Sequence, residues 1–517
     1  MEHVMTLEER IGALLIFGIP GTTITPEIVQ HFRDTHAGGL ILYRINFESP
    51  DQTRKLISDL ETALGRKLLV CVDHEGGRVI MFGQGVTIFP SAQAFGQTGN
   101  TQFVRHQGEQ EARELRRLGI DVNFAPVVDV LTQNWSSNIG IRAYGKDPEL
   151  VAKMGAARVS AQQVEGLSAV AKHFPGLGPA SLDPHLNLPT IDMTWEEWDK
   201  VHGIPFLRAM RTAVQGIMTS HPLYPKMDPT PRTPATFSRK IVYDNLRHRI
   251  GYKGVIFSDD LEMGAIREIC PIGEAAVRTV EAGHDALLVC HDLTAQRQAY
   301  DALVEAYKNS RLSTKELDDS VQRIENLKAR RPERFAPLPA TPLRAEKERT
   351  DAQALVQQIC EASVTMLKPG TALLPSKPTT VIFPKLSEMA PKILVEPALM
   401  NETAFLQERL SAVGFSQLEI KLVSLDASAA ETSAAAAAAA GAEQTLLFVF
   451  DAHLHAGTKN LLEQVQASAN RLAVILLRDV YDAEFVRDNV LCMTNYGFRV
   501  CDIEAVVRKM AVAAPVA

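Results

Sequence analysis

Paired cysteines at the spacing of metal or redox motifs are absent from this sequence. Its 517 residues contain six cysteines and no CxxC motif. Cys71 and Cys290 lie inside apolar, strand-like runs, which favours buried thiols over disulfide bonds. The other four are scattered along the chain: Cys270, Cys360, Cys492 and Cys501. We therefore expect a protein of the reducing cytoplasm rather than a secreted protein held by disulfides.

Long apolar segments and long runs of one charge sign are also missing. No stretch approaches the roughly 18 apolar residues that a membrane-spanning helix requires. The first residues, MEHVMTLEERIGALLIFGIPG, place acidic residues before a short apolar run and have no basic region, so we expect no signal peptide. The net charge of -7 is spread along the chain, which disfavours a nucleic-acid surface or a polybasic membrane anchor.

Short apolar runs that alternate with helical patterns are what the sequence has instead. Eight such runs lie at 14–19, 38–43, 67–73, 121–130, 168–174, 216–221, 254–260 and 286–290. Parallel strands that are covered on both faces have this continuous apolar character. The βα alternation therefore predicts an N-terminal (β/α)8 TIM-like barrel over residues 1–330. The first run is open to a second interpretation, as the end of a helix.

A second domain is predicted after the barrel, because the chain is too long for one ordinary domain. Residues 331–350, rich in proline and charge, are predicted to be a linker. Apolar runs begin again near residues 379, 444, 471 and 490, which predicts a C-terminal α/β sandwich domain over residues 351–517. The alanine-rich segment before the run at residue 444 predicts a helix capped by Thr432 or Ser433 and stopped by Gly441. No phosphate-binding glycine loop opens this domain, so we expect no nucleotide cofactor.

Polar residues gather at the carboxyl ends of the predicted barrel strands. Asp73, Asp129, Lys172, His173, His221, Asp259 and Asp260 all lie there. In (β/α)8 barrels this face carries the chemistry. Helix N-caps that follow strands would explain several of the aspartates but not the adjacent Lys-His pair.

The pair Asp259 and Asp260 ends the seventh run. Adjacent strand residues point to opposite faces, so one carboxylate can face the pocket as a nucleophile while the other binds a neighbouring loop. A role of both residues in capping the next helix is the alternative. In VDHEGGRV, Asp73 is the better candidate for ligand contact, whereas Glu75 and Arg78 are predicted to form a surface ion pair.

The segment AKHFPGLGPASLDPH supplies further candidates for proton transfer. Asp183 and His185 are two residues apart, and an aspartate that accepts from one imidazole nitrogen fixes the tautomer and raises the basicity of the other. This predicts an acid/base dyad on a loop. A metal held by His173, Asp183, His185 and His221 is disfavoured, since no HxH or HExxH spacing is present and Lys172 would repel a cation.

Five segments of the sequence, taken in order, resemble the motifs of glycoside hydrolase family 3: VDHEGGRV, FAPVVDV, KHFPGLGPASLDPH, IMTSH and GVIFSDDLEM. More narrowly, the chain is similar to the bacterial β-N-acetylglucosaminidase branch of peptidoglycan recycling. The resemblance implies that Asp259 is the nucleophile and His185 the acid/base, oriented by Asp183. It also implies contacts to the terminal sugar from Asp73, Arg142, Lys172 and His173, and a pocket lined by Met218 and His221.

Three positions depart from the pattern of that branch. Leu177 stands where the branch usually has a second histidine, and Pro184 stands where it has serine. Proline stiffens the peptide between the two members of the dyad. Where an arginine often follows shortly after GGRV, this chain reads IMF at residues 80–82. The catalytic atoms are all retained.

The resemblance implies a retaining, exo-acting β-N-acetylglucosaminidase that passes through a covalent glycosyl-aspartate. An imidazole with an ordinary pKa near 6.5 suits the acid/base role at neutral pH. A phosphorylase that uses inorganic phosphate instead of water, and a non-catalytic sugar-binding protein, remain alternatives. We expect a small GlcNAc-containing glycoside as partner, with no cofactor, metal, nucleic acid or membrane. The natural aglycone and the oligomeric state stay open.

Overall fold

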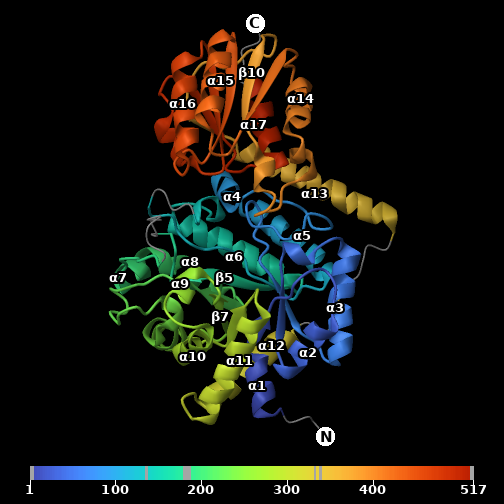
Figure 1. Cartoon of the computed structure of the whole chain (residues 1–517), viewed down its shortest axis with the longest axis vertical. Coiled ribbons are helices and arrows are strands. Elements are labelled where there is room, and N and C mark those ends of the chain that lie inside the picture. The colour runs from blue at the N-terminus through green and yellow to red at the C-terminus, as the bar shows by residue number, and fades with distance from the viewer. Residues whose placement is uncertain (1–4, 134–137, 179–187, 331–332, 337–340, 513–517) are drawn as a thin grey trace.

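The computed structural model describes residues 5–133, 138–178, 188–330, 333–336 and 341–512 (Figure 1). A closed barrel of eight strands forms the N-terminal part, and a six-stranded sheet forms the core of a second domain. Figure 1 shows the second domain stacked on one end of the barrel, on the side of α4 (Ala92–Thr98) and away from the N-terminus. Both parts of the predicted fold class are confirmed.

The barrel strands pair in parallel and in chain order. They are β1 (Leu15–Phe17), β2 (Gly39–Leu42), β3 (Leu69–Val72), β4 (Val122–Asn123), β5 (Ser168–Phe174), β6 (Gly216–Thr219), β7 (Val255–Asp260) and β8 (Ala286–Val289). Strand β8 pairs with β1 and closes the barrel, with Leu287 opposite Leu15. The first apolar run is therefore a strand, and the helix before it, α1 (Leu7–Ala13), ends one residue earlier than the run begins.

Helices cover the outside of the barrel, which explains why its strands are apolar on both faces. The longer ones are α2 (Pro26–Asp34), α3 (Pro50–Leu64), α5 (Thr101–Leu118), α6 (Pro148–Val164), α8 (Gly203–Arg211), α10 (Ile272–Ala282), α11 (Leu293–Lys308) and α12 (Thr314–Ala329). The sequence signals of α3 act as expected. Ser49 accepts a hydrogen bond from the amide of Gln52, Pro50 opens the helix, and Gly65 ends it with a φ of 68°.

The second domain has the strand order β11-β10-β12-β13-β14-β9. Its strands are β9 (Thr365–Lys368), β10 (Thr379–Pro384), β11 (Leu418–Val423), β12 (Gln444–Phe450), β13 (Leu472–Leu477) and β14 (Leu491–Thr494), and only β9 runs antiparallel. Its helices are α13 (Pro342–Ser363), α14 (Glu402–Ala412), α15 (Ala429–Gly441), α16 (Ala456–Ser468) and α17 (Val500–Val512). The neighbours Ile382 and Phe383 pack into separate apolar clusters, so both sheet faces are covered.

The alanine-rich helix α15 begins earlier than predicted. Its N-cap is Ser428, whose hydroxyl accepts from the amide of Glu431 while the Glu431 carboxylate accepts from the amide of Ser428. This reciprocal pair satisfies two amides that would otherwise lack partners, and it overrides the cap predicted at Thr432 or Ser433. Thr432 is buried inside the helix.

The connection between the domains lies between α12, which ends at Ala329, and α13, which begins at Pro342. The domain boundaries stay a prediction, and helix α13 already covers the second half of the segment predicted as a linker. Helix α13 packs against α4 (Ala92–Thr98) of the barrel and against α17 of the second domain. Within the described ranges, no helix is both long and apolar enough to cross a membrane.

Candidate active site

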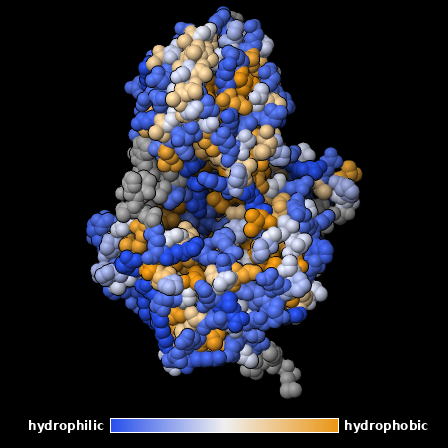
Figure 2. Space-filling model, viewed as in Figure 1, coloured by the Kyte–Doolittle hydropathy of each residue, from blue (hydrophilic) through white to orange (hydrophobic). Residues whose placement is uncertain are grey.

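A cavity of about 620 Å³ opens at the carboxyl ends of the barrel strands, where the second domain meets the barrel. Figure 2 shows a hollow at this junction with mainly hydrophilic residues inside it. Five of the predicted site residues line the cavity: Asp73, Arg142, Lys172, His173 and Asp259. The topology thus brings together residues that lie up to 186 positions apart, from Asp73 to Asp259.

A continuous chain of charged groups forms the floor of this cavity. Lys172 Nζ lies 2.5 Å from Asp73 Oδ1 and 2.6 Å from Glu75 Oε1. Arg142 donates to both oxygens of Glu75, from Nε at 2.8 Å and from Nη2 at 2.7 Å. Burial raises the pKa of Asp73, although Lys172 opposes this. The paired charges hold four side chains in one geometry, which suits recognition of several sugar hydroxyls at once.

Glu75 is not the surface residue that the sequence predicted. Only 6% of it is exposed, and its partners are Arg142 and Lys172 rather than Arg78. Burial acts to raise the pKa of its carboxyl, but the adjacent Arg142 and Lys172 charges hold that pKa well below its ordinary value. Glu75 is therefore a fixed anion between two buried cations.

Hydrogen bonds define the tautomer of His173. Arg142 Nη2 lies 3.3 Å from Nε2 of the ring, and because a guanidinium only donates, this nitrogen is the acceptor. The proton then lies on Nδ1, which donates to Asp129 Oδ2 at 2.8 Å. Asp129 also accepts from the amide of Leu177 at 2.6 Å, so it fixes both the ring and the start of the following loop. The sequence placed Asp129 at a strand end but assigned it no role.

Asp259 and Asp260 face different surroundings, as their alternation on a strand predicted. Asp259 is half-buried and lines the cavity, and its Oδ1 accepts from the amide of Asp260 at 2.8 Å. Asp260 turns to the next loops, where it accepts from the amide of Glu262 at 3.1 Å and pairs with His291 at 3.3 Å. Only the first carboxylate is thus available to a ligand.

The structure does not place Met218 and His221 in the cavity wall. Met218 is 1% exposed and belongs to the barrel core. His221 Nε2 lies 2.9 Å from the carbonyl of Asp260, and Nδ1 lies 2.7 Å from the hydroxyl of Thr236, which itself donates to the carbonyl of Ser220. Both ring nitrogens are therefore engaged in hydrogen bonds within the protein.

Neighbouring basic side chains act on Asp259. Burial works to raise the pKa of its carboxyl, but His221, His173 and Lys172 lower it below its ordinary value of 3.8. Asp259 is therefore held as a carboxylate at neutral pH.

The predicted dyad, Asp183 and His185, lies outside the described residues, as does Pro184. The last described residues before them include Leu177, which lines the cavity. Ile80 and Met81, in the segment IMF where an arginine was expected, line it as well. Two of the three sequence departures thus replace polar groups by apolar wall.

The second domain supplies part of the wall, which sequence reasoning missed. Lys392, Ile393 and Leu394 line the cavity opposite the barrel strands. Arg44 of the barrel fixes this loop by donating to the carbonyls of Ala390, Pro391 and Ile393. No signal in the sequence could have identified this pairing, since about 350 residues separate its two sides.

Two further residues of the second domain form hydrogen bonds with the loops that carry Glu75 and Arg142. Arg499 is buried and donates from Nε to the carbonyl of Gly77 at 2.7 Å, in the loop that carries Glu75. Gly77 has a φ of 53°, and a Cβ there would lie 2.6 Å from Ser91, so only glycine fits this loop. Asp479 Oδ1 accepts from the amide of Ile141 at 3.2 Å, in the turn that carries Arg142.

We expect Asp479→Ala to raise KM about tenfold while kcat changes less than threefold. The turn loses one charge-assisted hydrogen bond, and about 1.4 kcal/mol corresponds to tenfold. Steady-state kinetics on an aryl glycoside measure this split. Asp479→Asn keeps an acceptor for Ile141 and should recover most of the affinity. Asp482→Ala is the control, because Asp482 binds the amides of Ala452 and His453 in the same buried region. An equal rise in KM for this control would contradict the positioning role.

Comparisons with known proteins agree with this architecture. The family model described as "Glycosyl hydrolase family 3 N terminal domain" matches residues 6–327. A curated "Beta-hexosaminidase" of Nitrosomonas eutropha is 37% identical over 284 residues, which cover 54% of this chain and 80% of that protein. A second one, of Thioalkalivibrio sulfidiphilus, is 37% identical over 295 residues, covering 56% and 84%.

Solved structures are similar as well. The family 3 β-N-acetylglucosaminidase of Paenibacillus sp. str. FPU-7 superposes with a TM-score of 0.90 at 29% identity, covering 99% of this chain and 98% of that one. The NagZ structure of Neisseria gonorrhoeae matches with a TM-score of 0.56 at 30% identity, over 68% of this chain and 97% of that one. The barrel, its polar mouth and the family match lead to one conclusion: the chain belongs to glycosyl hydrolase family 3 and is a glycoside hydrolase.

Proposed function

We propose that this protein is a retaining, exo-acting β-N-acetylglucosaminidase that removes terminal non-reducing GlcNAc. Asp259 is the nucleophile, and His185, oriented by Asp183, is the acid/base. The observation that carries the proposal is that Asp259 lines the cavity formed by the sugar-binding candidates, where neighbouring basic groups lower the pKa of its carboxyl. The names of the similar proteins support GlcNAc as the sugar.

The shape of the site supports action on a chain end. The barrel floor is closed by the ion pairs of Asp73, Lys172, Glu75 and Arg142, so a sugar chain cannot extend through it. The terminal ring would rest on these groups, with its hydroxyls meeting carboxylate, ammonium and guanidinium. The aglycone would then point to the rim, towards Lys392 and Leu394 of the second domain.

The reaction proceeds in two balanced steps. Asp259 attacks the anomeric carbon, the glycosidic C–O bond breaks, and the proton of the His185 imidazolium passes to the leaving oxygen. The product is a glycosyl-aspartate ester. The neutral imidazole then takes a proton from water, whose oxygen attacks the anomeric carbon and releases Asp259 as carboxylate, with the configuration retained. The roles of Asp183 and His185 rest on the sequence motif.

Peptidoglycan recycling in the cytoplasm is the setting that we propose, with muropeptide-derived GlcNAc–anhydroMurNAc as the natural substrate and chitobiose as the main competitor. The branch that the motifs resemble supports this choice. A comparison of kcat/KM on the two disaccharides tests it, and a preference for chitobiose would overturn it.

Release of nitrophenol from an aryl N-acetylglucosaminide, with and without phosphate, tests the acceptor. We expect activity without phosphate, no acceleration by phosphate, and β-GlcNAc as the first product anomer by NMR. Formation of the sugar 1-phosphate would instead identify a phosphorylase, and no turnover would leave a sugar-binding protein.

His185→Ala should lower kcat/KM, which reports the step in which the leaving group departs, about tenfold to hundredfold on this aryl substrate, because nitrophenolate leaves with little protonation. On a disaccharide the loss should reach about 10³–10⁴-fold, since general acid help is then required. Steady-state kinetics on both substrates give the two ratios. Equal losses on the two substrates would remove His185 from the acid role.

A further inference from the structure

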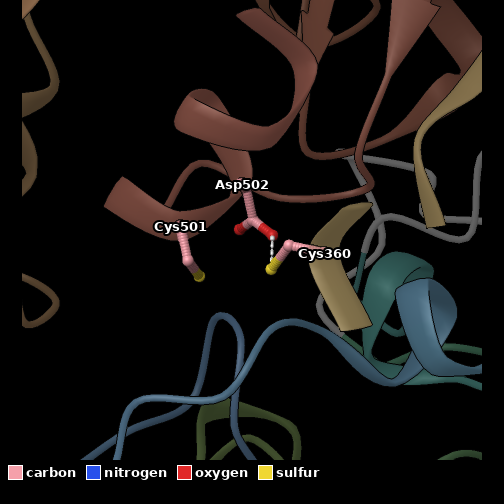
Figure 3. A group of neighbouring side chains, drawn as sticks. All are labelled: Cys360, Cys501 and Asp502. Atoms are coloured by element: carbon pink, nitrogen blue, oxygen red, sulfur yellow. Dashed lines mark hydrogen bonds between the residues drawn. The ribbon is translucent and has the colours of Figure 1, made fainter. Parts of the chain in front are cut away.

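Three potential metal ligands converge where the two domains meet, away from the candidate active site. Cys360 lies near the end of α13, and Cys501 and Asp502 lie in the first turn of α17. Their ligand atoms all lie within 4.8 Å of one another, and Cys360 Sγ is 3.8 Å from Asp502 Oδ1. Figure 3 shows both sulfur atoms and the carboxylate pointing into the same space.

The separation of these atoms fits a single small ion. A tetrahedral zinc ion with a Zn–S bond of about 2.3 Å and a Zn–O bond of about 2.0 Å sets its sulfur and oxygen ligands about 3.5 Å apart. The observed 3.8 Å between Cys360 and Asp502 needs only a small adjustment. Both cysteines are free of disulfide bonds, so both sulfurs are available.

The carboxylate of Asp502 is held in place by a set of supporting contacts. Its Oδ2 accepts from the amide of Arg499 at 3.0 Å, and Oδ1 accepts from Asn495 Nδ2 at 3.2 Å. Asn495 in turn accepts from the hydroxyl of Ser363 at 2.7 Å. A Cβ at Gly497 would lie 1.9 Å from Asp502 Oδ2, so the glycine makes room for the carboxylate. Such outer contacts orient metal ligands in known sites.

The nearest basic residue along the chain, Arg499, turns its side chain away from the cluster. The guanidinium of Arg499 directs its donors to the carbonyls of Gly77 and Leu394 instead of the cluster.

We propose that Cys360, Cys501 and Asp502 form a binding site for a thiophilic divalent cation of the zinc type. Binding replaces the two thiol protons by metal–sulfur bonds and releases them to solvent, without any change of oxidation state. Two thiolates and one carboxylate select zinc-like ions over magnesium or calcium. Cys501 also lines a cavity of about 750 Å³ together with Glu396 and Glu504, through which an ion and its water ligand can enter. The bound ion joins α13 to α17 and so stabilises the second domain.

Titration of the reduced, metal-free full-length protein with Cd²⁺ tests the site. We expect one ion per chain, a thiolate-to-metal charge-transfer band in the near ultraviolet, and release of about two protons by calorimetry in two buffers. Bound Zn²⁺ should protect two thiols from a disulfide reagent and raise the melting temperature in proportion to the logarithm of its concentration. Cd²⁺ held by imidazole or carboxylate groups alone gives no such band, so adventitious binding elsewhere is distinguished.

Matched variants decide the identity of the ligands. Cys501→Ser, at a half-buried position that tolerates the change, should lose the band and the thiol protection. Cys270→Ser is the control, since Cys270 is also half-buried but lies in the barrel. Asp502→Asn should weaken Cd²⁺ binding at least tenfold, and hydrolysis of the aryl substrate should stay within twofold in Cys501→Ser. An unchanged band in Cys501→Ser, or no band in the wild type, would overturn the proposal.

Discussion

Asp259→Asn should abolish hydrolysis, with kcat lowered by about 10⁴–10⁶-fold, as for other covalent catalysts that lose their nucleophile. The amide cannot form the ester intermediate, yet its oxygen can still accept from the amide of Asp260, so the strand end keeps its geometry. Steady-state kinetics on an aryl N-acetylglucosaminide measure the loss, and retained binding of GlcNAc by calorimetry shows that the site is intact.

The neighbouring Asp260→Asn is the matched control. Asp260 does not line the cavity; it binds the amide of Glu262 and pairs with His291 at the cavity wall, so we expect less than a tenfold loss of kcat. Mass spectrometry of the wild type stalled with a fluorinated N-acetylglucosaminide should find the label on the peptide that contains Asp259. More than 1% residual activity in Asp259→Asn, or an equal loss in Asp260→Asn, would remove Asp259 from the nucleophile role.

Glu75→Ala should lower the stability of the barrel by about 3–5 kcal/mol, the range for loss of one partner from a buried ion pair. Arg142 and Lys172 are then left as buried cations without this counterion. Calorimetric unfolding of the barrel transition measures the change. The proposed sugar site is built on the same side chains, so kcat/KM should fall at least a hundredfold.

Glu165→Ala is the control, because Glu165 pairs with Arg113 through side chains that are 28% and 40% exposed. Exposed pairs contribute about 0–1 kcal/mol, and we expect a loss in that range.

The ordinary pKa of Glu75 is 4.5 and its folded-state pKa is lower, so its stabilisation is complete above pH 4.5 and is lost as the pH falls towards the folded-state pKa. Glu75→Gln should therefore make the free energy of unfolding less dependent on pH in this acidic range. A loss of stability below about 1 kcal/mol for Glu75→Ala would contradict the role of Glu75 as a buried counterion.

Much of the site was predictable because its signals are local. Lys172, His173 and Asp259 were recognisable as strand-end residues, and parallel strands bring their carboxyl ends to one mouth. The different roles of Asp259 and Asp260 followed from side-chain alternation along a strand. The signal for the cap of α15 was also local. The prediction nevertheless placed the cap at Thr432 or Ser433, next to the long alanine run, and not at Ser428 with its partner Glu431.

Ion-pair and hydrogen-bond partners that lie far apart in the chain could not be predicted from the sequence. Glu75 looked like a surface acid, because its cations lie 67 and 97 positions further along the chain. Asp479 and Arg499 reach the sugar-site loops from a different domain. Cys360 and Cys501 have no motif spacing at 141 residues apart, yet their sulfurs converge.

The sequence by itself determined the two-domain α/β architecture, the position of each barrel strand and the residue types at its mouth. These follow from periodicity and from neighbours within a few residues, which act before the chain has folded. Only the tertiary structure decided which acids are buried against which cations, and which loops of the second domain complete the site. Burial and ion pairing depend on contacts between segments that come together only when the domains pack.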